Sequence, residues 1–592
     1  MDFRRLFDLF TYQQARFPQK HALASREGRH WKYYSTEACV EAIDQVSAGL
    51  IRIGLSWGEK AAIVSEAGSP LWNFLDLGMQ QLGVVVVPIH TSIGKEEVRY
   101  ILKDARVGYC FTAERKAHQL VLSLQSELLD LKKILPFYSD AENKGFDAFM
   151  TPPSEKHLET IQASRAAIHE DDLATIVYTS GTEGSPRGVM LSHKNIVSNI
   201  KSVIPLIPIN RDKRALSFLP LSHIFERMVT YTYIATGASL HYATGTENLL
   251  EEISETRPHY FSCVPRILEK FYEAFRMEYT SRSRLHKRLF KWAMTLSNQK
   301  AETANMSIGY WLKLIFAQLL VFRKWRRSLG NKLEGIVVGA AALPERLARI
   351  FHTAGIEIRE GYGLTETSPV VTFNRFEPGG FRFGTVGIPV PGVNVRIERL
   401  SPDKEGEIMI KGPNVMMGYF GREKETQAAI NPEGWLYTGD LGTFVDKRFL
   451  KITGRKKDLF KTSSGKYVAP LYLEQKLKSS VFVEQCLVFG ANRPFVSALI
   501  IPSIPALKEW CEENGVHWTA PQFMVINPKV LERMKEEIEN INEELPTHSK
   551  IREFVLLHKR WTQEGGEITL TFKPKRSEIL KKYHKQIEEI YH

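Results

Sequence analysis

The sequence predicts an α/β protein with a large N-terminal domain of doubly wound sheets, a β-rich subdomain within it, and a smaller α+β domain at the C-terminal end. Three observations predict this class. Strand and helix patterns alternate over residues 1–150, short strands with Gly and Pro turns follow from 384 to about 451, and residues 457–592 mix both patterns. At 592 residues the chain is too long for one hydrophobic core, so we expect several structural units.

The first 150 residues contain four clearly periodic segments. Short apolar runs at 61–64, 83–89 and 108–112 are typical of buried strands, and 96–104 has the spacing of a helix. This alternation predicts a parallel sheet. The polar, Pro-containing stretch 140–171 is typical of a linker.

The β-rich subdomain is expected over about 384–451, with strands at 393–397 and 406–410. After it, strands at 486–489 and 497–501 and helices at 530–544 and 576–591 indicate a separate unit. We therefore expect an N-terminal domain 1–456 and a C-terminal domain 457–592.

Composition narrows the class of protein. A hydrophobic content of 43% and a charged content of 25% are ordinary for a globular chain. The five cysteines are far apart and form no metal-binding spacing, which fits a reducing compartment. We expect no signal peptide and no spanning helix, because no long apolar segment opens the chain or occurs within it. These features favour a cytoplasmic protein.

The net charge of +12 is concentrated in one segment. Between 282 and 332 there are twelve Lys or Arg residues against one acid, Glu302, and many large apolar side chains. Basic and aromatic residues at helical spacing are typical of a helix that lies on an anionic membrane surface. The alternative is a helical hairpin packed on the main body with solvated cations. We do not expect nucleic-acid binding, because no nucleic-acid module accompanies the patch.

A loop rich in glycine and hydroxyl side chains follows the apolar run 173–177. Residues 178–189 contain four Ser or Thr residues, three glycines and the cation Arg187 within a few positions. Glycines let backbone N–H groups approach a phosphate, hydroxyls donate hydrogen bonds, and the cation neutralises charge. The apolar periodicity after the loop predicts that it lies between a strand and a helix. It is not the P-loop motif, because Gly188 rather than Ser or Thr follows the cation.

The wording of this loop resembles the phosphate loop of the adenylate-forming, or AMP-binding, superfamily. Further blocks in the same order resemble that family's carboxylate-pocket, adenine, adenine/metal, ribose, hinge and C-terminal lysine segments, at 218–227, 338–343, 360–367, 435–442, 452–458 and 569–576. The segments 223–227 and 264–266 resemble the long-chain fatty acyl-CoA synthetase branch.

The resemblance implies ATP, Mg²⁺ and coenzyme A as ligands and assigns nucleotide contacts residue by residue. Arg187 would meet the phosphates, although most members have Lys there, and Tyr362 would stack on adenine. Glu366 and Thr182 would hold Mg²⁺. The other implied nucleotide-binding positions are Thr179, Ser180, Gly181, Glu183, Gly184, Gly339, Ala340, Ala341, Glu360, Gly361, Gly363, Thr365, Asp440 and Arg455. Glu183 stands where a Thr is more usual, and we expect it to pair with Arg187 or with Mg²⁺.

The same resemblance implies the catalytic parts. Lys573 would bridge the acyl carboxylate and the α-phosphate, although Phe572 stands where the family usually has Gly. His223 would lie near the acyl carboxylate, or else be a satisfied core histidine. A mobile C-terminal domain would turn about Lys457, and Gly465 would then line a tunnel for the thiol.

The implied function is activation of a long-chain fatty acid to acyl-AMP and then to acyl-CoA. An acyl-carrier protein could replace CoA as the thiol acceptor. A luciferase-like oxygenase of the same fold and a lipid-binding scaffold without catalysis are the alternatives from other classes.

Overall fold

The computed structural model describes residues 3–28, 30–138, 145–179, 186–281, 283–299, 307–399, 405–463, 466–562, 564–568 and 574–591. The chain forms two compact units. Unit 1 comprises Met1–Ala340, Arg349–Val395 and Ile410–Tyr437, and unit 2 comprises Ala341–Ala348, Arg396–Met409 and Thr438–His592. The domain boundary after residue 456 remains a prediction.

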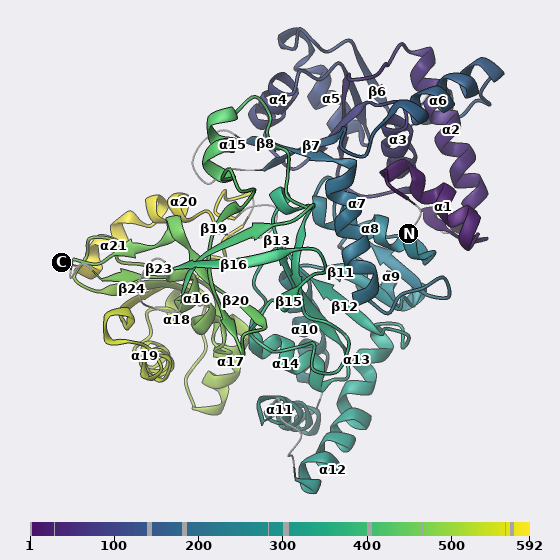
Figure 1. Ribbon diagram of the computed structural model, residues 1–592. Helices are drawn as coiled ribbons and strands as arrows, with labels where there is room; N and C mark the ends of the chain where they lie inside the picture. Colours follow the sequence, from purple (N-terminus) through teal and green to yellow (C-terminus); the bar gives the residue numbers. More distant parts are fainter. Residues whose placement is uncertain are drawn as a thin grey trace. The chain divides into compact units, whose positions relative to one another are not determined.

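A seven-stranded sheet forms one part of unit 1 (Figure 1). Its strands lie in the order β18-β8-β7-β4-β3-β5-β6, and β7, β4, β3, β5 and β6 are parallel. The strands are β3 (Lys60–Ser65), β4 (Val85–His90), β5 (Tyr109–Thr112), β6 (Lys133–Pro136), β7 (Leu173–Thr179), β8 (Arg187–Ser192) and β18 (Gly418–Tyr419). The strands and the helix predicted for 61–112 are therefore confirmed, the helix being α4 (Lys95–Asp104). Apolar residues at alternate strand positions, such as Ala62 and Val64, pack against Val98 and Ile101 of α4.

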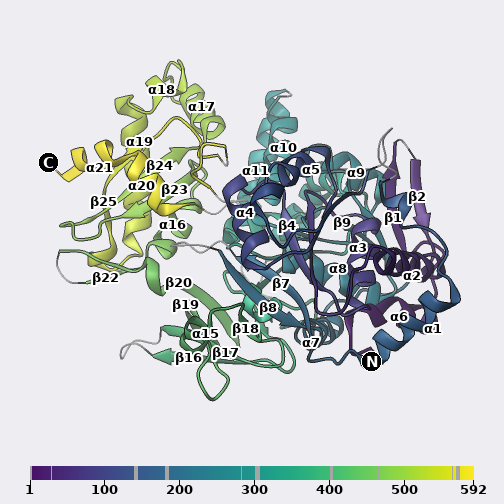
Figure 2. The ribbon, with the colours of Figure 1, turned by 90° about the horizontal axis from the view of Figure 1, so that it is seen from above.

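A nine-stranded sheet forms the other part of unit 1, in the order β15-β14-β13-β12-β11-β9-β10-β1-β2. Its strands are β1 (Leu23–Glu27), β2 (His30–Tyr34), β9 (Arg214–Ser217), β10 (Ser239–Tyr242), β11 (Tyr260–Cys263), β12 (Gly335–Val338), β13 (Ile358–Gly363), β14 (Val370–Phe373) and β15 (Ile388–Pro389). The six strands from β13 to β1 run parallel, while β2, β14 and β15 are antiparallel additions at the edges. Figure 2 shows β1 and β2 at the edge of unit 1.

Helices cover both sheets of unit 1, as expected where parallel strands are joined by crossover connections. They include α1 (Leu9–Arg16), α2 (Thr36–Arg52), α3 (Pro70–Gln80), α5 (Arg115–Leu122), α7 (His193–Val203), α8 (Ile224–Thr236), α9 (Leu249–Thr256) and α15 (Glu423–Ala429). The helix α14 (Glu345–Thr353) crosses a boundary between the two units. These elements confirm the predicted α/β class.

Three local predictions were wrong. The segment after the glycine-rich loop is the strand β8, antiparallel to β7, and α7 begins only after it. Within the predicted linker 140–171, Ser154 caps the helix α6 (Glu155–Ala167) through a hydrogen bond from the backbone N–H of His157. The predicted helix 576–591 is divided at Tyr583 into α20 (Arg576–Lys582) and α21 (His584–Tyr591).

The segment predicted as membrane-binding or as a hairpin consists of several helices beside α10 (Pro265–Thr280): α11 (Arg284–Gln299), α12 (Ile308–Ala317), the π-helical turn η5 (Gln318–Phe322) and α13 (Arg323–Ser328). Their shared core is aromatic. Trp325 is fully buried and stacks on Phe275 with ring centroids 4.7 Å apart, and Tyr279 stacks on Phe290. In Figure 1, α11 and α12 extend from the rest of unit 1.

Unit 2 contains mainly short sheets. A four-stranded sheet has the order β16-β17-β19-β20 and consists of β16 (Asn394–Arg399), β17 (Gly406–Lys411), β19 (Leu436–Val445) and β20 (Phe449–Arg455). A hairpin, β21 (Phe460–Lys461) and β22 (Tyr467–Val468), precedes the sheet of β23 (Val483–Phe489), β24 (Val496–Pro502) and β25 (Ile551–Leu556). The accompanying helices are α16 (Pro470–Lys478), α17 (Ile504–Glu513), α18 (Pro521–Met524) and α19 (Pro528–Glu543), with α20 and α21. These sheets and helices confirm the predicted α+β character.

Candidate active site

Several predicted site segments follow parallel strands of the nine-stranded sheet at one edge. The strands β9, β11, β12 and β13 run in the same direction, so their C-terminal ends share that edge. The loop with His223 follows β9, Gly339 and Ala340 follow β12, and Tyr362 lies at the end of β13. Ligands of open α/β sheets bind outside the carboxyl ends of the strands. The fold therefore brings three separate sequence blocks to the edge where a ligand is expected.

The turn after β12 is close to its neighbours and open to solvent. A Cβ atom on Gly339 would lie 3.0 Å from the ring of Phe225, so a larger residue would require that ring or the turn to shift slightly. Ala340 has a φ of 67°, in the left-handed region, and Ala340 and Ala341 are both exposed. The turn thus offers small side chains and accessible backbone, which fits the flat face of a base.

The loop between β13 and β14 is held by its own hydrogen bonds. The hydroxyl of Thr367 donates to the carbonyl of Pro369 at 2.5 Å, and the backbone N–H of Leu364 donates to the same carbonyl at 3.2 Å. At Gly363 a Cβ atom would lie 1.7 Å from that carbonyl oxygen, so only glycine fits. This bracing fixes the short helix η6 (Thr365–Thr367), which carries Thr365 and Glu366.

Glu366 is connected to Arg187 through a tyrosine. The hydroxyl of Tyr419 donates to Oε1 of Glu366 at 2.9 Å, and the guanidinium of Arg187 lies 5.3 Å from the centre of the same ring. Burial raises the pKa of Tyr419, which keeps its hydroxyl protonated as a donor. The pairing of β18 with β8 places Tyr419 beside Arg187, and the backbone N–H of Met416, just before β18, donates to the carbonyl of Glu366.

Arg187 forms an ion pair with Glu425, at 3.1 Å from Nε to Oε2. The expected partner, Glu183, lies outside the described residues, so its pairing remains a prediction. Tyr419 and Glu425 were missed by sequence reasoning, because nothing local connects them with positions 187 and 366.

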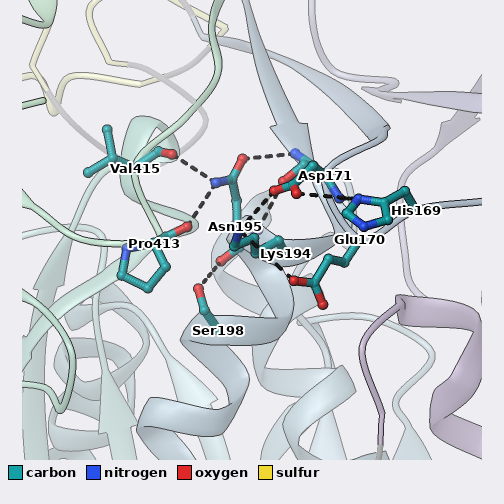
Figure 3. Close-up of polar contacts among 9 residues, drawn as sticks. His169, Glu170, Asp171, Lys194, Asn195, Ser198, Pro413 and Val415 are labelled. Carbon is teal, nitrogen blue, oxygen red and sulfur yellow. Dashed lines mark hydrogen bonds and ion pairs between the residues drawn. The ribbon is translucent and has the colours of Figure 1, made fainter.

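Asn195 joins the start of α7 to the chain segment before β18. Its amide nitrogen donates to the carbonyls of Pro413 and Val415, each at 2.8 Å (Figure 3). The next residue, Met416, donates its backbone N–H to the carbonyl of Glu366 at 2.9 Å. Asn195 therefore supports Glu366 indirectly, through the segment 413–416. In the same view the ammonium of Lys194 lies 3.0 Å from the carboxylate of Asp171, just before β7.

His223 is exposed at the N-terminal end of α8, which excludes the alternative of a core histidine. Three residues later Glu226 is fully buried and accepts hydrogen bonds from Ser217 on β9, at 2.6 Å, and from Ser262 on β11. Burial raises the pKa of Glu226 to about 7. Glu226 thus anchors the start of α8, and with it His223, to the ends of two strands. No local signal in the sequence predicted this anchoring role of Glu226.

Arg227 connects α8 to α3 and to the seven-stranded sheet. It is buried against Asp76 of α3, with 2.5 Å between Nη2 and Oδ1, and donates to the hydroxyl of Thr175 on β7 at 2.8 Å. A buried guanidinium must be paired in this way, since a lone charge in the interior is very costly. The pair holds β7, which leads to the glycine-rich loop, in a fixed place relative to α8.

In unit 2, Asp440 and Arg455 face each other across paired strands. Asp440 of β19 lies opposite Arg455 of β20, and Nε of Arg455 donates to Oδ1 of Asp440 at 2.7 Å. Two positions before Asp440, the hydroxyl of Thr438 donates to the carbonyl of Ile408 at 2.7 Å and fixes the turn.

The predicted hinge lies directly after this pair. Lys457 is exposed in the short helix η7 (Lys456–Asp458). Its neighbour Lys456 lies 2.7 Å from the buried carboxylate of Glu407, which also accepts a hydrogen bond from the backbone N–H of Gly439 at 3.0 Å. Glu407, another residue that the sequence analysis missed, thus links the hinge region to the turn before Asp440.

Some predicted residues lie outside the described parts of the chain: Ser180, Gly181, Thr182, Glu183, Gly184, Gly465 and Lys573. Among the residues that are described, no group of three or more His, Cys, Asp or Glu side chains could hold a metal ion. Glu366 retains acceptor capacity beyond its bond with Tyr419, and Mg²⁺ is commonly held by one or two carboxylates together with phosphate oxygens. The described residues therefore fit the implied Mg²⁺.

Comparison with known proteins identifies the family. The model for the AMP-binding enzyme matches residues 10–420, and the model for the AMP-binding enzyme C-terminal domain matches 457–592. The chain belongs to this adenylate-forming family. The fold agrees: it is similar to the adenylation domain of a carboxylate reductase from Mycobacterium chelonae, with a TM-score of 0.74 and 18% identity, over 99% of this chain and 91% of the other.

Among curated relatives, the long-chain-fatty-acid–CoA ligase FadD15 of Mycobacterium bovis is 32% identical over 93% of this chain and 92% of its own. The human long-chain-fatty-acid–CoA ligase 1 is 27% identical over 95% of this chain and 82% of its own. A solved structure of o-succinylbenzoate coenzyme A synthetase from Bacillus subtilis, in complex with ATP and magnesium ion, has a TM-score of 0.65 and 20% identity, over 96% of this chain and 98% of that one.

Proposed function

We propose that the protein is a long-chain fatty acid–CoA ligase. A carboxylate oxygen of the fatty acid attacks the α-phosphate of ATP, and pyrophosphate leaves. The thiol of CoA then loses its proton and attacks the acyl carbon, and AMP leaves. The arrangement of Glu366, Tyr419 and Arg187 carries this proposal, because it supplies a braced carboxylate for a metal and a cation for phosphate.

The residues take the following proposed roles. Arg187 and the loop that begins at Thr179 bind phosphates, Glu366 and Thr182 hold Mg²⁺, and Asp440 accepts the ribose hydroxyls. Bound Mg²⁺ neutralises charge on the phosphates. Lys573 stabilises the charge that develops during adenylation, and His223 contacts the acyl carboxylate. Adenylation depends on positioned charges more than on covalent catalysis. The hydrogen bond from Tyr419, which holds Glu366 in place, would therefore favour the reaction.

Both CoA and the long chain are proposed from the relatives' names and from the long-chain motif at 223–227. An acyl-carrier protein as acceptor is the second candidate, because the excess of basic residues in the chain would suit an acidic carrier as well as the phosphates of CoA.

The test measures AMP and thioester formed by the purified chain with ATP, Mg²⁺ and palmitate, with and without CoA. We expect AMP release and acyl-CoA to depend on CoA, and Glu366→Gln to lose both. Adenylate that CoA does not discharge would favour a carrier protein. Absence of adenylation with acids of short, medium and long chain would overturn the ligase proposal, and oxygen-dependent light emission would indicate the oxygenase class.

A further inference from the structure

The segment α12–η5 has large apolar side chains on two faces. One face is buried: Tyr310, Leu314, Ala317, Val321 and Phe322 pack into unit 1. The other face is exposed to solvent. Its side chains are between 51% and 82% exposed and comprise Ile308, Trp311, Leu312, Ile315, Phe316, Leu319 and Leu320. We call these seven residues the apolar stripe.

The spacing of the apolar stripe shows that it is one continuous surface. Its positions are separated alternately by three residues and by one, which places them along one side of a helix. Scattered exposed apolar residues are normal, but a contiguous patch with Trp and Phe marks a contact surface on a soluble chain. The aromatic core around Trp325 already packs the helices of this segment together, so fold stability does not require the stripe.

The charges beside the stripe indicate what covers it. Exposed cations lie on the same group of helices: Arg284 and Arg288 on α11, Lys313 on α12, and Arg323 and Arg327 on α13. The one acid between 282 and 332, Glu302, lies outside the described residues. The surface therefore needs a partner that is apolar at its centre and anionic around it.

Two other cations of the segment are engaged in contacts within unit 1. Lys324 pairs with Glu278 on α10, and Arg326 donates to the side chain of Gln318 and to the carbonyl of Ala354, the latter at 2.6 Å. The four-cation cluster of 323–327 is thus only half exposed. Arg323 and Arg327 are the appropriate pair to change when its electrostatic role is tested.

We propose that the apolar stripe inserts into the surface of a membrane that contains anionic lipid. A helix of this kind lies in the plane of the interface with its apolar face about 5–10 Å deep, while long cationic side chains reach the headgroups. None of the described helices has both the length and the hydropathy to cross a bilayer, so the contact is peripheral. A second copy of the chain is the less suitable occupant, because two copies of this face would bring like charges together.

This placement goes beyond the proposed ligase activity and would hold without it. If the ligase proposal is also correct, the stripe would bring the enzyme to the surface where long-chain acids partition. Vesicle binding needs no turnover, so failure of one proposal is distinguishable from failure of the other.

The experiment is co-sedimentation of the full chain with vesicles of phosphatidylcholine alone or with about one-third phosphatidylglycerol. We expect binding that prefers the anionic vesicles and weakens with salt. Phe316→Glu with Leu320→Glu should weaken it by about ten-fold or more, since two apolar side chains become charged in the interface. Arg323→Gln with Arg327→Gln should reduce the preference for anionic lipid, because two of the five exposed cations are lost.

The matched control is Phe523→Glu with Ile526→Glu, which adds the same charge at apolar residues that are 59% and 68% exposed in unit 2, against 58% and 54% for Phe316 and Leu320. It should bind as the unchanged chain does. Equal binding by the stripe variant and this control would overturn the proposal. So would a stripe variant that still binds vesicles but changes from dimer to monomer in sedimentation velocity, since the face would then belong to a second copy.

Should the stripe variant fail to fold, Trp311 offers an independent measurement. Brominated lipid should quench the fluorescence of the unchanged chain, and Trp311→Phe should lose that quenched component while it still binds. Equal quenching in both would place Trp311 outside the membrane and contradict the proposal.

Discussion

At the scale of single residues, Tyr419 contacts both Glu366 and Arg187. Its hydroxyl donates to Glu366, and its face lies beneath the guanidinium of Arg187. Glu366 and Arg187 come from sequence blocks nearly 180 positions apart, so the tyrosine sets the relation between the proposed metal ligand and the proposed phosphate cation.

Tyr419→Phe keeps the ring and removes only the hydroxyl. We expect the KM for MgATP to rise about ten-fold, because a hydrogen bond to a charged group contributes roughly 1.5–3 kcal/mol. Kinetics at several Mg²⁺ concentrations measure the effect. Tyr233→Phe is the control, since the buried hydroxyl of Tyr233 has no partner among the described residues. An unchanged KM and Mg²⁺ dependence for Tyr419→Phe would show that the hydroxyl does not position Glu366.

Glu226 makes stability depend on pH. Burial raises its pKa to about 7 from the ordinary 4.5. Between pH 4.5 and pH 7 the folded chain therefore keeps a proton on Glu226 that the unfolded chain has released. Stability from this group is therefore full at low pH and is lost as pH rises through about 7, by at most about 3 kcal/mol.

Glu226→Gln should flatten this pH dependence, because an amide does not titrate. Urea unfolding at pH 5 and pH 8 measures it, with the exposed Glu589→Gln as control. If the variant and the unchanged chain lose equal stability between the two pH values, Glu226 is not the titrating group.

At the scale of elements, α7 supports the site without belonging to it. Asn195 fastens its first turn to the carbonyls of Pro413 and Val415, and the adjoining Met416 binds the backbone of Glu366. The segment 410–420 is far from α7 in sequence, so this support arises only in the folded chain.

Asn195→Asp removes the donor and places a carboxylate against two carbonyl oxygens. We expect a loss of about 2 kcal/mol in stability and a raised KM for MgATP, since the segment beside Glu366 loosens. The control is Ser198→Ala, which removes only the hydrogen bond from the Ser198 hydroxyl to the carbonyl of Asn195. It should change neither the stability nor the KM for MgATP appreciably. A destabilised Asn195→Asp with an unchanged KM would limit the role of Asn195 to folding.

Elements with clear periodicity were predictable, and those whose partner lies elsewhere were not. The strands β3, β4 and β5 and the helix α4 follow from apolar spacing alone. By contrast, 187–192 form a strand because β7 on one side and β18 on the other supply backbone partners. The helix α6 was hidden by a polar composition, although Ser154 provided a capping signal.

At the scale of the whole molecule, the family resemblance implies that the C-terminal domain changes position between the two proposed steps. Lys457 is the expected hinge, and its neighbour Lys456 is held by Glu407. Hinge residues absorb changes in φ and ψ far from the chemistry.

Lys457→Pro fixes φ at this position and should spare adenylation while it slows thioester formation by a factor of about 10² or more. Single-turnover measurements of acyl-AMP formation and of its discharge by CoA separate the two steps. The control is Lys457→Ala, which removes the same side chain but leaves φ of residue 457 free to change. Equal loss of both steps in Lys457→Pro would refute the hinge role.

The sequence by itself determined the fold class, the adenylate-forming family and the order of the site blocks, because strand and helix periods and short motifs are local properties. Only the tertiary structure decided which residues support Glu366 and Arg187 and which side chains of 282–332 are exposed. Tyr419, Glu425 and Asn195 reach their partners through strand pairing and packing between distant segments. On α12 an apolar pattern alone cannot tell a buried face from an exposed one, and the packing around Trp325 makes that choice.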